Sequence, residues 1–386
     1  MTSLMSRLLV ITELFLPTKG GTAVWAAEVY KRLGGKEIHI VTAEVPDARD
    51  FDLDHPNNIH RLDLRRLPWL RPESLPIYLR LFARSFRLAI THRFDAIHAF
   101  RALPEGLVGW AVARLTFRPL VTYAHGEELT TWGNGGKFKV MRFVLHHSDE
   151  VIANSEHTRD TLLHMGIAAD RIAVIYPGVD VEVFRPGLDT KGLRESIGIA
   201  ANEKLVFSVG RLQRRKGFDH LIDALAELRG RGLPVALAIA GVGDDRDYLR
   251  TRIEAHAAQR HMHLLGAVGA ADLPRWMNAC DVFAMPNREI DGDNEGFGMV
   301  FIEAAACGKP VVAGLAGGTG AAVIDGVTGR RVDGRQVERI AQALEQVLFD
   351  ETLARTMGEA ALKRARAEFA WTAVATKTRT LRTGIG

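Results

Sequence analysis

Short runs of apolar, often β-branched residues alternate with longer segments of helical periodicity along almost the whole chain. In the first half, the apolar runs predict strands at 7–12, 37–43, 95–100, 118–124 and 149–155. Segments with the spacing of amphipathic helices lie between them and begin near Thr22, Glu73, Leu103 and Ser155. Alternation of this kind predicts βαβ units that build a parallel sheet.

A stretch rich in proline and glycine interrupts this alternation at 176–203. A second series of predicted strands follows it, at 204–210, 234–241, 262–266, 280–285 and 310–314. From about Asp350 onward the pattern is helical and charged. We therefore predict two α/β halves of similar architecture with a cleft between them, and ligands at the carboxyl ends of the strands.

Length and composition are those of an ordinary water-soluble protein. The 386 residues suffice for two domains, and 47% of them are hydrophobic and 25% charged. Cys280 and Cys307 lie in apolar surroundings and are interpreted as buried, reduced thiols. Glu13 interrupts the first apolar run, so we do not interpret that run as a signal peptide, and no run is long enough to span a membrane. The expected location is the cytoplasm.

Net charge is only +4, but the arginines are unevenly distributed. Between Arg61 and Arg93 there are eight arginines and no lysine. At helical spacing the segment forms two faces, one of Arg80, Arg84 and Arg87 and one of Leu79, Phe82, Phe86 and Ile90. The arginine face is either an ordinary solvated helix surface or a surface attracted to anionic lipid headgroups. The second interpretation would place the protein peripherally on the inner face of the plasma membrane.

Glycine-rich loops after predicted strands are the first candidates for ligand binding. Gly20 and Gly21 end the loop after the first strand, and a helix follows at once, so backbone amides there can approach an anion closely. In the second half, Gly241 and Gly243 match the first two glycines of the dinucleotide fingerprint, but Arg246 replaces the third. We therefore predict a nucleotide-lining loop there and no NAD site.

A basic loop follows the first strand of the second half. Gly210 ends the strand, Arg211 comes directly after it, and Lys216 stands at the start of the next helix. Two cations at a strand-to-helix junction can neutralise a diphosphate without a metal. Arg214 and Arg215 lie in the same loop and are interpreted as solvated.

The most informative segment is EGFGMVFIE at 295–303. Glu295 lies in a loop, and Glu303 lies over the first turns of the helix that follows. Carboxylates accept hydrogen bonds from pairs of neighbouring hydroxyl groups, so one of them can hold a sugar and the other a ribose. A helix start with acidic residues favoured by the helix dipole is the simpler explanation, but the basic loop earlier in the chain favours a ligand. The ligand-facing residues between the two carboxylates are Gly296, Phe297, Gly298, Met299 and Val300.

Asp291 and Asp293 form a DxD triplet, which can hold a divalent cation or begin a calcium loop. The calcium pattern requires an acid where this chain has Ile302, so that interpretation fails. We expect a solvated acidic loop and no metal.

Among the fourteen histidines, His125 follows a strand directly and precedes a glycine. This position would project its ring into the cleft, where it could donate a hydrogen bond to a substrate. The pairs His146–His147 and His261/His263 lack a third partner at ligand spacing and are interpreted as structural or exposed.

Together these motifs resemble glycosyltransferase family 4, a large family of retaining enzymes with the GT-B fold. The resemblance spans nearly the whole chain, and its motifs are GR…KG at 210–217, EGFGMVFIE, ANSEHTRD at 153–160, YPGVD and FRPG. AHGEE at 124–128 and FAMP at 283–286 are similar to segments of phosphatidylinositol-mannoside mannosyltransferases and related cell-surface glycan enzymes. The resemblance implies two Rossmann-like, doubly wound domains that face a central cleft.

The resemblance also implies which domain binds which substrate. Residues 1–178 would bind the acceptor, and 179–370 would bind a nucleotide sugar. Residues 371–386, with the helix around Trp371, would cross back to the first domain. The donor would be GDP-mannose or a UDP-hexose, with no further cofactor. The acceptor would be a glycan, a lipid-linked compound or a small molecule, and no nucleic acid is expected as a partner.

Individual roles follow from the same resemblance. Arg211 and Lys216 would bind the donor diphosphate and stabilise the leaving nucleotide. Glu303 would hold the ribose hydroxyls, and Glu295 would hold the donor sugar near its C3 hydroxyl. The other implied contacts are the amides of Gly298 and Met299 to the sugar, Gly21 to the phosphate, and His125 to the sugar. No nucleophile for a covalent intermediate stands out. The working hypothesis is therefore that the acceptor attacks the donor sugar on the same face from which the nucleotide departs.

One segment departs from the family pattern. In AGGTGAAV, Gly320 and Ala321 stand where the family commonly has proline and glutamate. Three other functions stay open at this point: a GT-B epimerase or phosphorylase, an NAD-dependent oxidoreductase, and a non-catalytic nucleotide-sugar-binding protein. A phosphorylase needs a pyridoxal lysine site, which we cannot place, and Arg246 disfavours the oxidoreductase.

Overall fold

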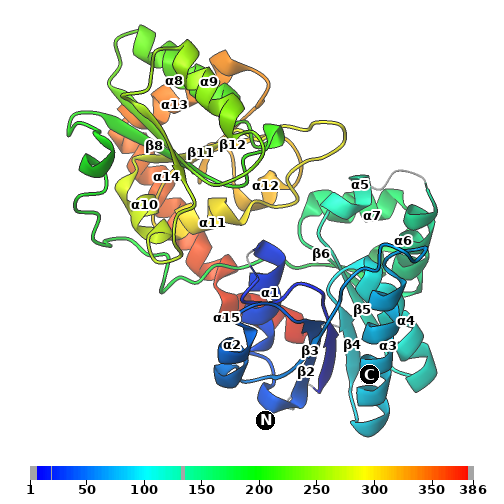
Figure 1. Ribbon diagram of the computed structural model, residues 1–386. Helices are drawn as coiled ribbons and strands as arrows, with labels where there is room; N and C mark the ends of the chain where they lie inside the picture. The colour runs from blue at the N-terminus through cyan, green and yellow to red at the C-terminus, as the bar shows by residue number, and fades with distance from the viewer. Residues whose placement is uncertain (1–6, 19, 132–134, 381–386) are drawn as a thin grey trace. The chain divides into compact units, whose positions relative to one another are not determined.

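The chain forms two compact units in a computed structural model that describes residues 7–18, 20–131 and 135–380 (Figure 1). Unit 1 comprises Met1–Pro177 and Trp371–Gly386, and unit 2 comprises Gly178–Ala370. The division lies within one residue of the boundary expected from the sequence. The substrate assigned to each unit stays a prediction.

Unit 1 is built on a seven-stranded parallel sheet with the order β3-β2-β1-β4-β5-β6-β7. Its strands are β1 Leu8–Ile11, β2 Ile38–Ala43, β3 Asn58–Leu62, β4 Ala96–Ala99, β5 Leu120–Ala124, β6 Glu150–Ala153 and β7 Ile172–Val174. The central strands are buried along their whole length, which explains why they appear in the sequence as continuous apolar runs. The strand order reverses between β1 and β4, and ligands bind doubly wound sheets at such a point.

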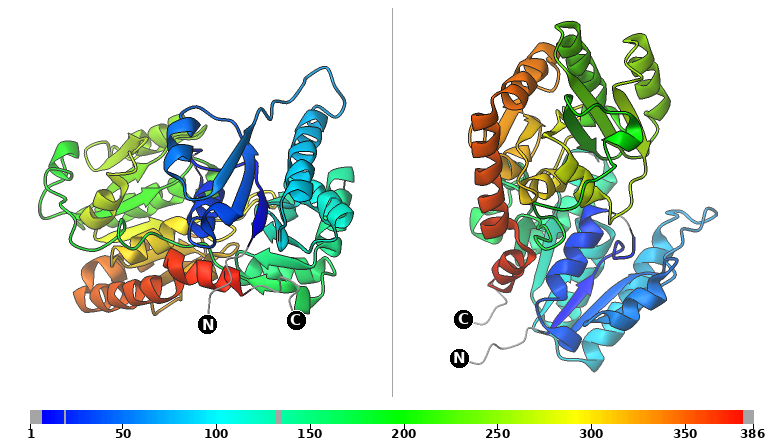
Figure 2. Two further views of the ribbon diagram at one scale, coloured as in Figure 1. Left: turned by 90° about the horizontal axis from the view of Figure 1, so that it is seen from below. Right: turned by 90° about the vertical axis from the view of Figure 1, so that its left-hand side faces the viewer.

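The main helices of unit 1 lie on both sides of this sheet. They are α1 Gly21–Tyr30, α2 Ala48–Asp54, α3 Leu75–Thr91, α4 Leu107–Thr116, α5 Glu127–Thr131, α6 Gly136–His147, α7 Glu156–His164 and α15 Trp371–Arg379. The C-terminal helix α15 packs beside α1 (Figures 1 and 2), and Trp371 and Val374 are buried in this contact region. Helix α15 therefore belongs to unit 1, although it follows unit 2 in the chain.

Unit 2 contains a six-stranded parallel sheet with the order β10-β9-β8-β11-β12-β13. Its strands are β8 Lys204–Val209, β9 Val235–Ala240, β10 Met262–Gly266, β11 Val282–Met285, β12 Val311–Gly314 and β13 Gly329–Val332. The helices are α8 Phe218–Gly230, α9 Arg246–Ala255, α10 Leu273–Ala279, α11 Met299–Ala306, α12 Thr319–Ala322, α13 Val337–Phe349 and α14 Glu351–Arg364. The helices α8, α9 and α13 lie on one side of the sheet, and α10, α11 and α14 on the other (Figure 1).

The predicted strands agree with β1, β2, β4–β6 and β8–β12 to within a few residues. Three edge strands, β3, β7 and β13, were not predicted, and neither were the helices α2, α5 and α6. The three strands are only partly buried, and β3 and β7 are so along their whole length. They therefore lack the continuous apolar run by which the inner strands are predicted. Cys280 and Cys307 are buried and unbonded, as expected.

The predicted apolar face of α3 is confirmed only for Phe82 and Phe86, which are partly buried and pack against the core of unit 1. The residues buried against the sheet are Ile77, Leu81, Ser85 and Leu88. Leu79 and Ile90 are instead 59% and 63% exposed. Apolar residues cover more than half of the circumference of this helix, so their spacing alone does not decide which stripe faces inward. Among the described residues, no helix is both long and apolar enough to cross a membrane.

Candidate functional site

The loops after β8, β9, β11 and β12 carry the residues that the sequence singled out in unit 2. These strands are neighbours in a parallel sheet, so the loops at their carboxyl ends lie at one edge of it. The short helix η5, Arg214–Lys216, follows β8, and the segment 286–298 connects β11 to α11.

Glu295 and Lys216 meet directly in this edge region. The Lys216 Nζ donates to Glu295 Oε2, and the two residues are 79 positions apart in sequence. Both side chains are only 13% exposed. Burial alone would raise the pKa of Glu295, but the positive charges of Lys216 and Arg215 outweigh it, so its pKa lies below the usual value. Glu295 is therefore an ionised carboxylate held by cations.

The prediction that Arg215 is solvated is wrong. Its side chain is 12% exposed, its Nε lies 3.0 Å from Asp293 Oδ2, and its Nη1 lies 3.4 Å from Glu295 Oε2. Arg215 thereby fixes the acidic loop beside Glu295. Asp293 belongs to the DxD triplet, and its task in this structure is an ion pair. Among the described residues no three His, Cys, Asp or Glu side chains cluster as a metal site would require.

Arg214, in contrast, has an exposed side chain that pairs with Asp245 at 3.3 Å and lies over the Tyr248 ring. Arg211 is also exposed, and it has no ion pair or side-chain hydrogen bond within the described part of the chain. An uncommitted guanidinium at the end of β8 is suited to bidentate contact with a phosphate. The predicted diphosphate pair thus consists of one open cation, Arg211, and one cation already engaged, Lys216.

The backbone at positions 241 and 243 requires glycine whether or not a ligand binds. Their φ angles are 146° and 159°, and a Cβ atom would come within 1.9 Å of Gly210 O and 2.5 Å of Leu212 O, respectively. The loop after β9 therefore packs backbone to backbone against the loop after β8. Leu212 N donates to Val242 O at 3.0 Å across this contact. The two glycines therefore allow the loops after β8 and β9 to pack in contact.

The N-terminus of α11 points its first amides toward the same region. Gly298 precedes the helix with a φ of 87°, and a Cβ there would lie 2.5 Å from the Phe301 ring. Met299 and Val300 occupy the first turn, where a helix provides no acceptor for the backbone N–H. Phe297 is 3% exposed and its ring packs on Phe369, so the ring belongs to the core, and a contact of its backbone amide with a ligand stays a prediction.

Glu303 lies one turn farther along α11. Burial raises the pKa of Glu303 to about 7, and its Oε2 is screened from water with no hydrogen-bond partner among the described residues. Leaving a buried carboxylate oxygen unpaired costs about 1–3 kcal/mol. Hydroxyl donors from a ligand would remove that cost, and this fits the role expected for Glu303.

The departure in AGGTGAAV has a structural explanation. A Cβ on Gly320 would lie 2.9 Å from the Arg331 guanidinium, which donates to Leu315 O and Thr319 Oγ1 at 3.1 and 3.2 Å. Glycine at this position therefore leaves room for Arg331. The preceding Gly318 donates its N–H to Glu295 O at 2.7 Å, so this loop still supports the acidic motif.

A buried ion pair with no recognisable signal in the sequence supports the start of α8, directly after the basic loop. Arg288 donates to both carboxylate oxygens of Asp219, at 2.8 and 2.7 Å. The side chains are 10% and 4% exposed. Burial opposes ionisation of Asp219, but the Arg288 contacts lower its pKa overall. The pair ties the first turn of α8 to the segment after β11, and so links the two halves of the Lys216–Glu295 contact.

In unit 1, His125 is at the end of β5 as predicted, but its Nε2 is engaged. It lies 2.7 Å from Phe100 O, so Nε2 is the protonated nitrogen and Nδ1 is left as an acceptor. The ring packs edge-on against Trp25, one turn into α1. His125 thus lies close to the first turn of α1, which begins at Gly21 after Gly20, with a φ of 144°.

A second charged cluster of unit 1 was also missed. Arg101 Nη2 lies 2.8 Å from Glu13 Oε2 and 2.9 Å from Glu105 Oε1, at the carboxyl ends of β1 and β4. Glu105 is fully buried, and its Oε2 has no hydrogen-bond partner among the described residues. Its signal in the sequence was weak, because the three residues belong to no recognisable motif.

Two family models match this chain. Residues 19–183 match the model described as Glycosyltransferase Family 4, and residues 189–364 match Glycosyl transferases group 1. The chain is 31% identical to the D-inositol 3-phosphate glycosyltransferase of Corynebacterium aurimucosum, covering 93% of this chain and 89% of the relative. It is also 31% identical to the GDP-mannose-dependent alpha-(1-6)-phosphatidylinositol monomannoside mannosyltransferase of Mycobacterium tuberculosis, covering 97% of both chains.

Solved structures share the fold. Anabaena HepE in complex with UDP and glucose superposes with a TM-score of 0.80 at 24% identity, covering 96% of this chain and 97% of that one. Sucrose-phosphate synthase from Thermosynechococcus elongatus gives a TM-score of 0.79 at 22% identity over 97% of each chain. The chain belongs to glycosyltransferase family 4 and is a glycosyltransferase with the GT-B fold.

Proposed function

We propose that the enzyme transfers a hexose from a nucleoside diphosphate sugar to a hydroxyl group with retention of the anomeric configuration, and that unit 2 binds the donor. The observation that carries the proposal is the direct contact of Lys216 with Glu295. It brings the cation expected at the diphosphate and the carboxylate expected at the sugar to one place. Arg211 and Glu303 add an uncommitted cation and an unpaired carboxylate oxygen.

Donor binding would rearrange these charges. The diphosphate would bind Arg211 and draw Lys216 away from Glu295, with the first amides of α11 facing the sugar and phosphate. Glu295, released from Lys216 but still beside Arg215, would accept hydrogen bonds from sugar hydroxyls. Preorganised cations of this kind stabilise the charge that develops on the leaving group, and in our proposal they replace a metal.

The transfer step follows from this arrangement. The acceptor oxygen forms a bond with the anomeric carbon while the bond from that carbon to the β-phosphate oxygen breaks. The electron pair of the broken bond stays on the nucleoside diphosphate, which Arg211 and Lys216 neutralise. The proton of the acceptor hydroxyl passes to the departing phosphate oxygen on the same face of the sugar. The products are the glycoside and the nucleoside diphosphate.

The relatives indicate which substrates to test first. One relative is named for GDP-mannose and a phosphatidylinositol monomannoside, another for inositol 3-phosphate, and HepE was solved with UDP and glucose. We propose GDP-mannose or a UDP-hexose as the donor. The acceptor would be a glycan, a lipid-linked compound or a small molecule, bound by unit 1.

The proposal is tested by supplying the full-length protein with GDP-mannose or UDP-glucose and an inositol-containing acceptor, with and without EDTA. We expect a product with the α configuration by NMR, formed at the same rate in EDTA. A β product would overturn retention, and loss of activity in EDTA that added metal restores would overturn the metal-free site. Tight donor binding without transfer to any acceptor or to water would favour a binding protein.

Glu303 gives the donor affinity a defined pH dependence. With its pKa raised to about 7, Glu303 is mostly protonated below neutrality, and only the carboxylate can accept two hydroxyl donors. The affinity for the intact nucleotide sugar, which has no terminal phosphate that titrates in this range, should therefore fall as pH decreases, becoming about tenfold weaker at about pH 6 than at about pH 8. Isothermal titration measures this directly. Glu303→Gln should bind more weakly and with little change across the same range, and an unchanged pH profile in this variant would contradict the assignment.

We further propose that α3 and the loop before it contact an anionic membrane surface. In this proposal exposed apolar residues make the contact, whereas the sequence led us to expect the arginine face. Arg84 is engaged with His60 Nδ1 at 2.7 Å and Arg80 with Asp63, so the arginine face is partly occupied. The outward face carries Leu79 and Ile90 instead, and the loop at 63–74 extends past the end of α3 with Trp69 77% exposed (Figure 2). Exposed apolar and aromatic groups beside arginines suit a lipid interface.

The triple variant Trp69→Ser, Leu79→Ser and Ile90→Ser should bind vesicles of phosphatidylglycerol and phosphatidylcholine at least about tenfold more weakly than the unmodified protein. Co-sedimentation at low salt measures it. Leu53→Ser is the control, because Leu53 is 77% exposed on α2, on the other side of the unit 1 sheet. Failure of the unmodified protein to bind these vesicles, or equal loss in the control, would refute the membrane contact.

A further inference from the structure

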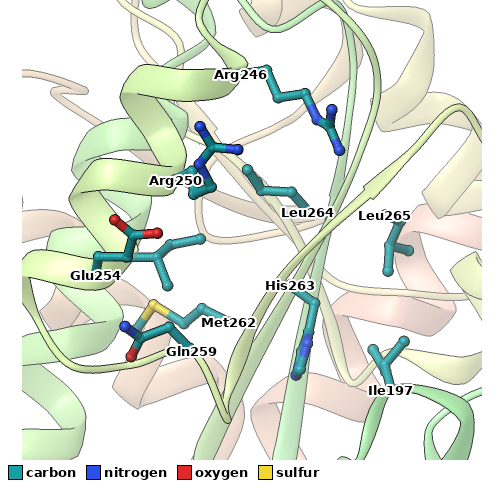
Figure 3. Close-up of a pocket in the computed structure, with 10 residues that line it drawn as sticks. Ile197, Arg246, Arg250, Glu254, Gln259, Met262, His263, Leu264 and Leu265 are labelled. Atoms are coloured by element: carbon teal, nitrogen blue, oxygen red, sulfur yellow. The ribbon is translucent and has the colours of Figure 1, made fainter.

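Unit 2 contains a cavity that the donor site does not use. Its volume is about 510 Å³, within the range of small-molecule sites, and it lies between α9 and the outer strand β10 (Figure 3). Arg211, Lys216, Glu295 and Glu303 are not among the residues that line it. The cavity therefore needs a separate explanation.

The walls of the cavity differ in character at its two ends. Arg246 and Arg250 lie one helical turn apart on α9, and Figure 3 shows their guanidinium groups at the same end, beside Leu264. The remaining surface is largely apolar and comes from Ile197, Ile253, Met262, Leu264 and Leu265, and Gln259, His263 and Glu254 also line it. An apolar body would lie along this floor, with its charged group at the arginines.

The two arginines of the cavity are incompletely paired within the protein. Arg246 has no side-chain partner in the described part of the chain, and Arg250 pairs only with the exposed Asp247, at 3.0 Å. Two arginines four residues apart on a helix repel each other. Glu254 in the lining and Asp247 beside it offset the two positive charges overall, but Asp247 is 81% exposed and Arg246 has no direct partner of its own among the described residues. An anion bound between the arginines would remove the repulsion.

His263 supplies a second observation that points to a ligand. Its ring is hydrogen-bonded to the backbone of Arg260, and its Nε2 is buried without a partner among the described residues. A buried ring nitrogen that is left unpaired is unfavourable, since water cannot satisfy it. A polar group of a ligand in this cavity would offer it a hydrogen bond.

We infer that the cavity between α9 and β10 binds a small amphipathic anion, with a carboxylate or phosphate group held by Arg246 and Arg250 and an apolar body on Ile197, Met262 and Leu264. This site goes beyond the proposed transfer reaction and belongs to unit 2 alone. The two guanidinium groups accept either anion, because each presents parallel N–H donors to paired oxygens. Apolar contact along the floor distinguishes such a ligand from a simple ion.

The probes for this site are octyl phosphate and octanoate below their micelle concentrations, with inorganic phosphate and octyl glucoside as the anion alone and the apolar chain alone. We expect isothermal titration to detect one or both amphipathic anions at affinities far above those of the two partial probes. Binding should persist in protein saturated with nucleoside diphosphate, which separates this site from the donor site. The comparison of octyl phosphate with octanoate identifies the preferred head group.

Variants test the location. Arg246→Gln and Arg250→Gln should each weaken binding of the preferred anion by about tenfold, because each removes a charge-assisted contact. Arg366→Gln is the matched control, an exposed arginine of unit 2 outside the cavity. Ile197→Asn should weaken the amphipathic anion and leave inorganic phosphate unchanged. No binding by either amphipathic anion, equal affinity for inorganic phosphate, or unchanged affinity in both cavity arginine variants would overturn the inference, whatever the outcome for the donor.

Discussion

Replacement of Lys216 by alanine is expected to lower the rate of sugar transfer by about 100- to 1000-fold, the usual effect of removing one preorganised group that stabilises developing charge. The loss should appear mainly in kcat, because the charge of the leaving diphosphate is greatest in the transition state. Arg211 remains as the second cation, which limits the loss. Steady-state kinetics with the preferred donor measures both parameters.

The matched control is Lys204→Ala, since Lys204 lies in the same unit and makes only a 3.8 Å contact with the exposed Glu351. Its activity should stay within about twofold of the unmodified enzyme, as for most surface changes. A Lys216→Ala variant with the circular dichroism of the folded protein and unmodified turnover would refute the role of Lys216. The same spectra show whether a loss of turnover in Lys216→Ala comes from unfolding or from the missing side chain in a folded protein.

The Lys216–Glu295 pair also predicts that replacing Glu295 changes nucleotide binding and sugar transfer in opposite directions. Glu295→Gln removes the charge that occupies Lys216 in the unliganded protein, so the free nucleoside diphosphate should bind about tenfold more tightly, as the loss of a nearby negative charge implies. Sugar transfer should nevertheless fall, because the hexose loses its carboxylate. A purely structural role for Glu295 predicts weaker binding and weaker transfer together, and titration with the nucleotide distinguishes the two.

The sequence is most informative where the fold demands continuous apolar strands and glycine. The inner strands of both sheets are buried on both faces, so they appear as apolar runs, and the order of the loops along the chain places the candidate residues at their carboxyl ends. In this way the sequence predicts a functional loop at Gly241 and Gly243. Their close approach to the β8 loop is a matter of tertiary packing that no local pattern reveals.

The sequence is less informative about charged side chains, whose partners are far away along the chain. Arg214 and Arg215 are adjacent and chemically identical, yet one is exposed over Tyr248 and the other is buried between Asp293 and Glu295. The direction of each side chain is set by the helix η5 and by the segment after β11. For the same reason the contacts of Arg101 with Glu13 and Glu105 could not be predicted.

The largest effect on stability is expected from breaking the Asp219–Arg288 pair. Asp219→Ala leaves Arg288, at 10% exposure, as an uncompensated buried cation, and removal of one partner of such a pair costs about 3–5 kcal/mol. The carboxylate keeps its lowered pKa through Arg288, so its contribution is present at neutral pH and is lost as pH falls through that lowered pKa. Urea unfolding at neutral pH measures the free energy change, on the assumption of cooperative unfolding of unit 2.

The position of the Asp219–Arg288 pair also predicts an effect on activity, which a control variant and a double variant separate from the effect on stability. Glu359→Gln, which breaks the exposed Arg355–Glu359 pair on α14, should cost less than about 0.5 kcal/mol and serves as the control. Replacing both buried partners at once, with Asp219→Leu and Arg288→Met, should recover much of the stability, because no unpaired charge remains. Since the pair joins the start of α8 to the segment after β11, the double variant should still transfer sugar slowly, through poorer alignment of Lys216 with Glu295. Full stability with full activity in Asp219→Ala would contradict both parts of this argument.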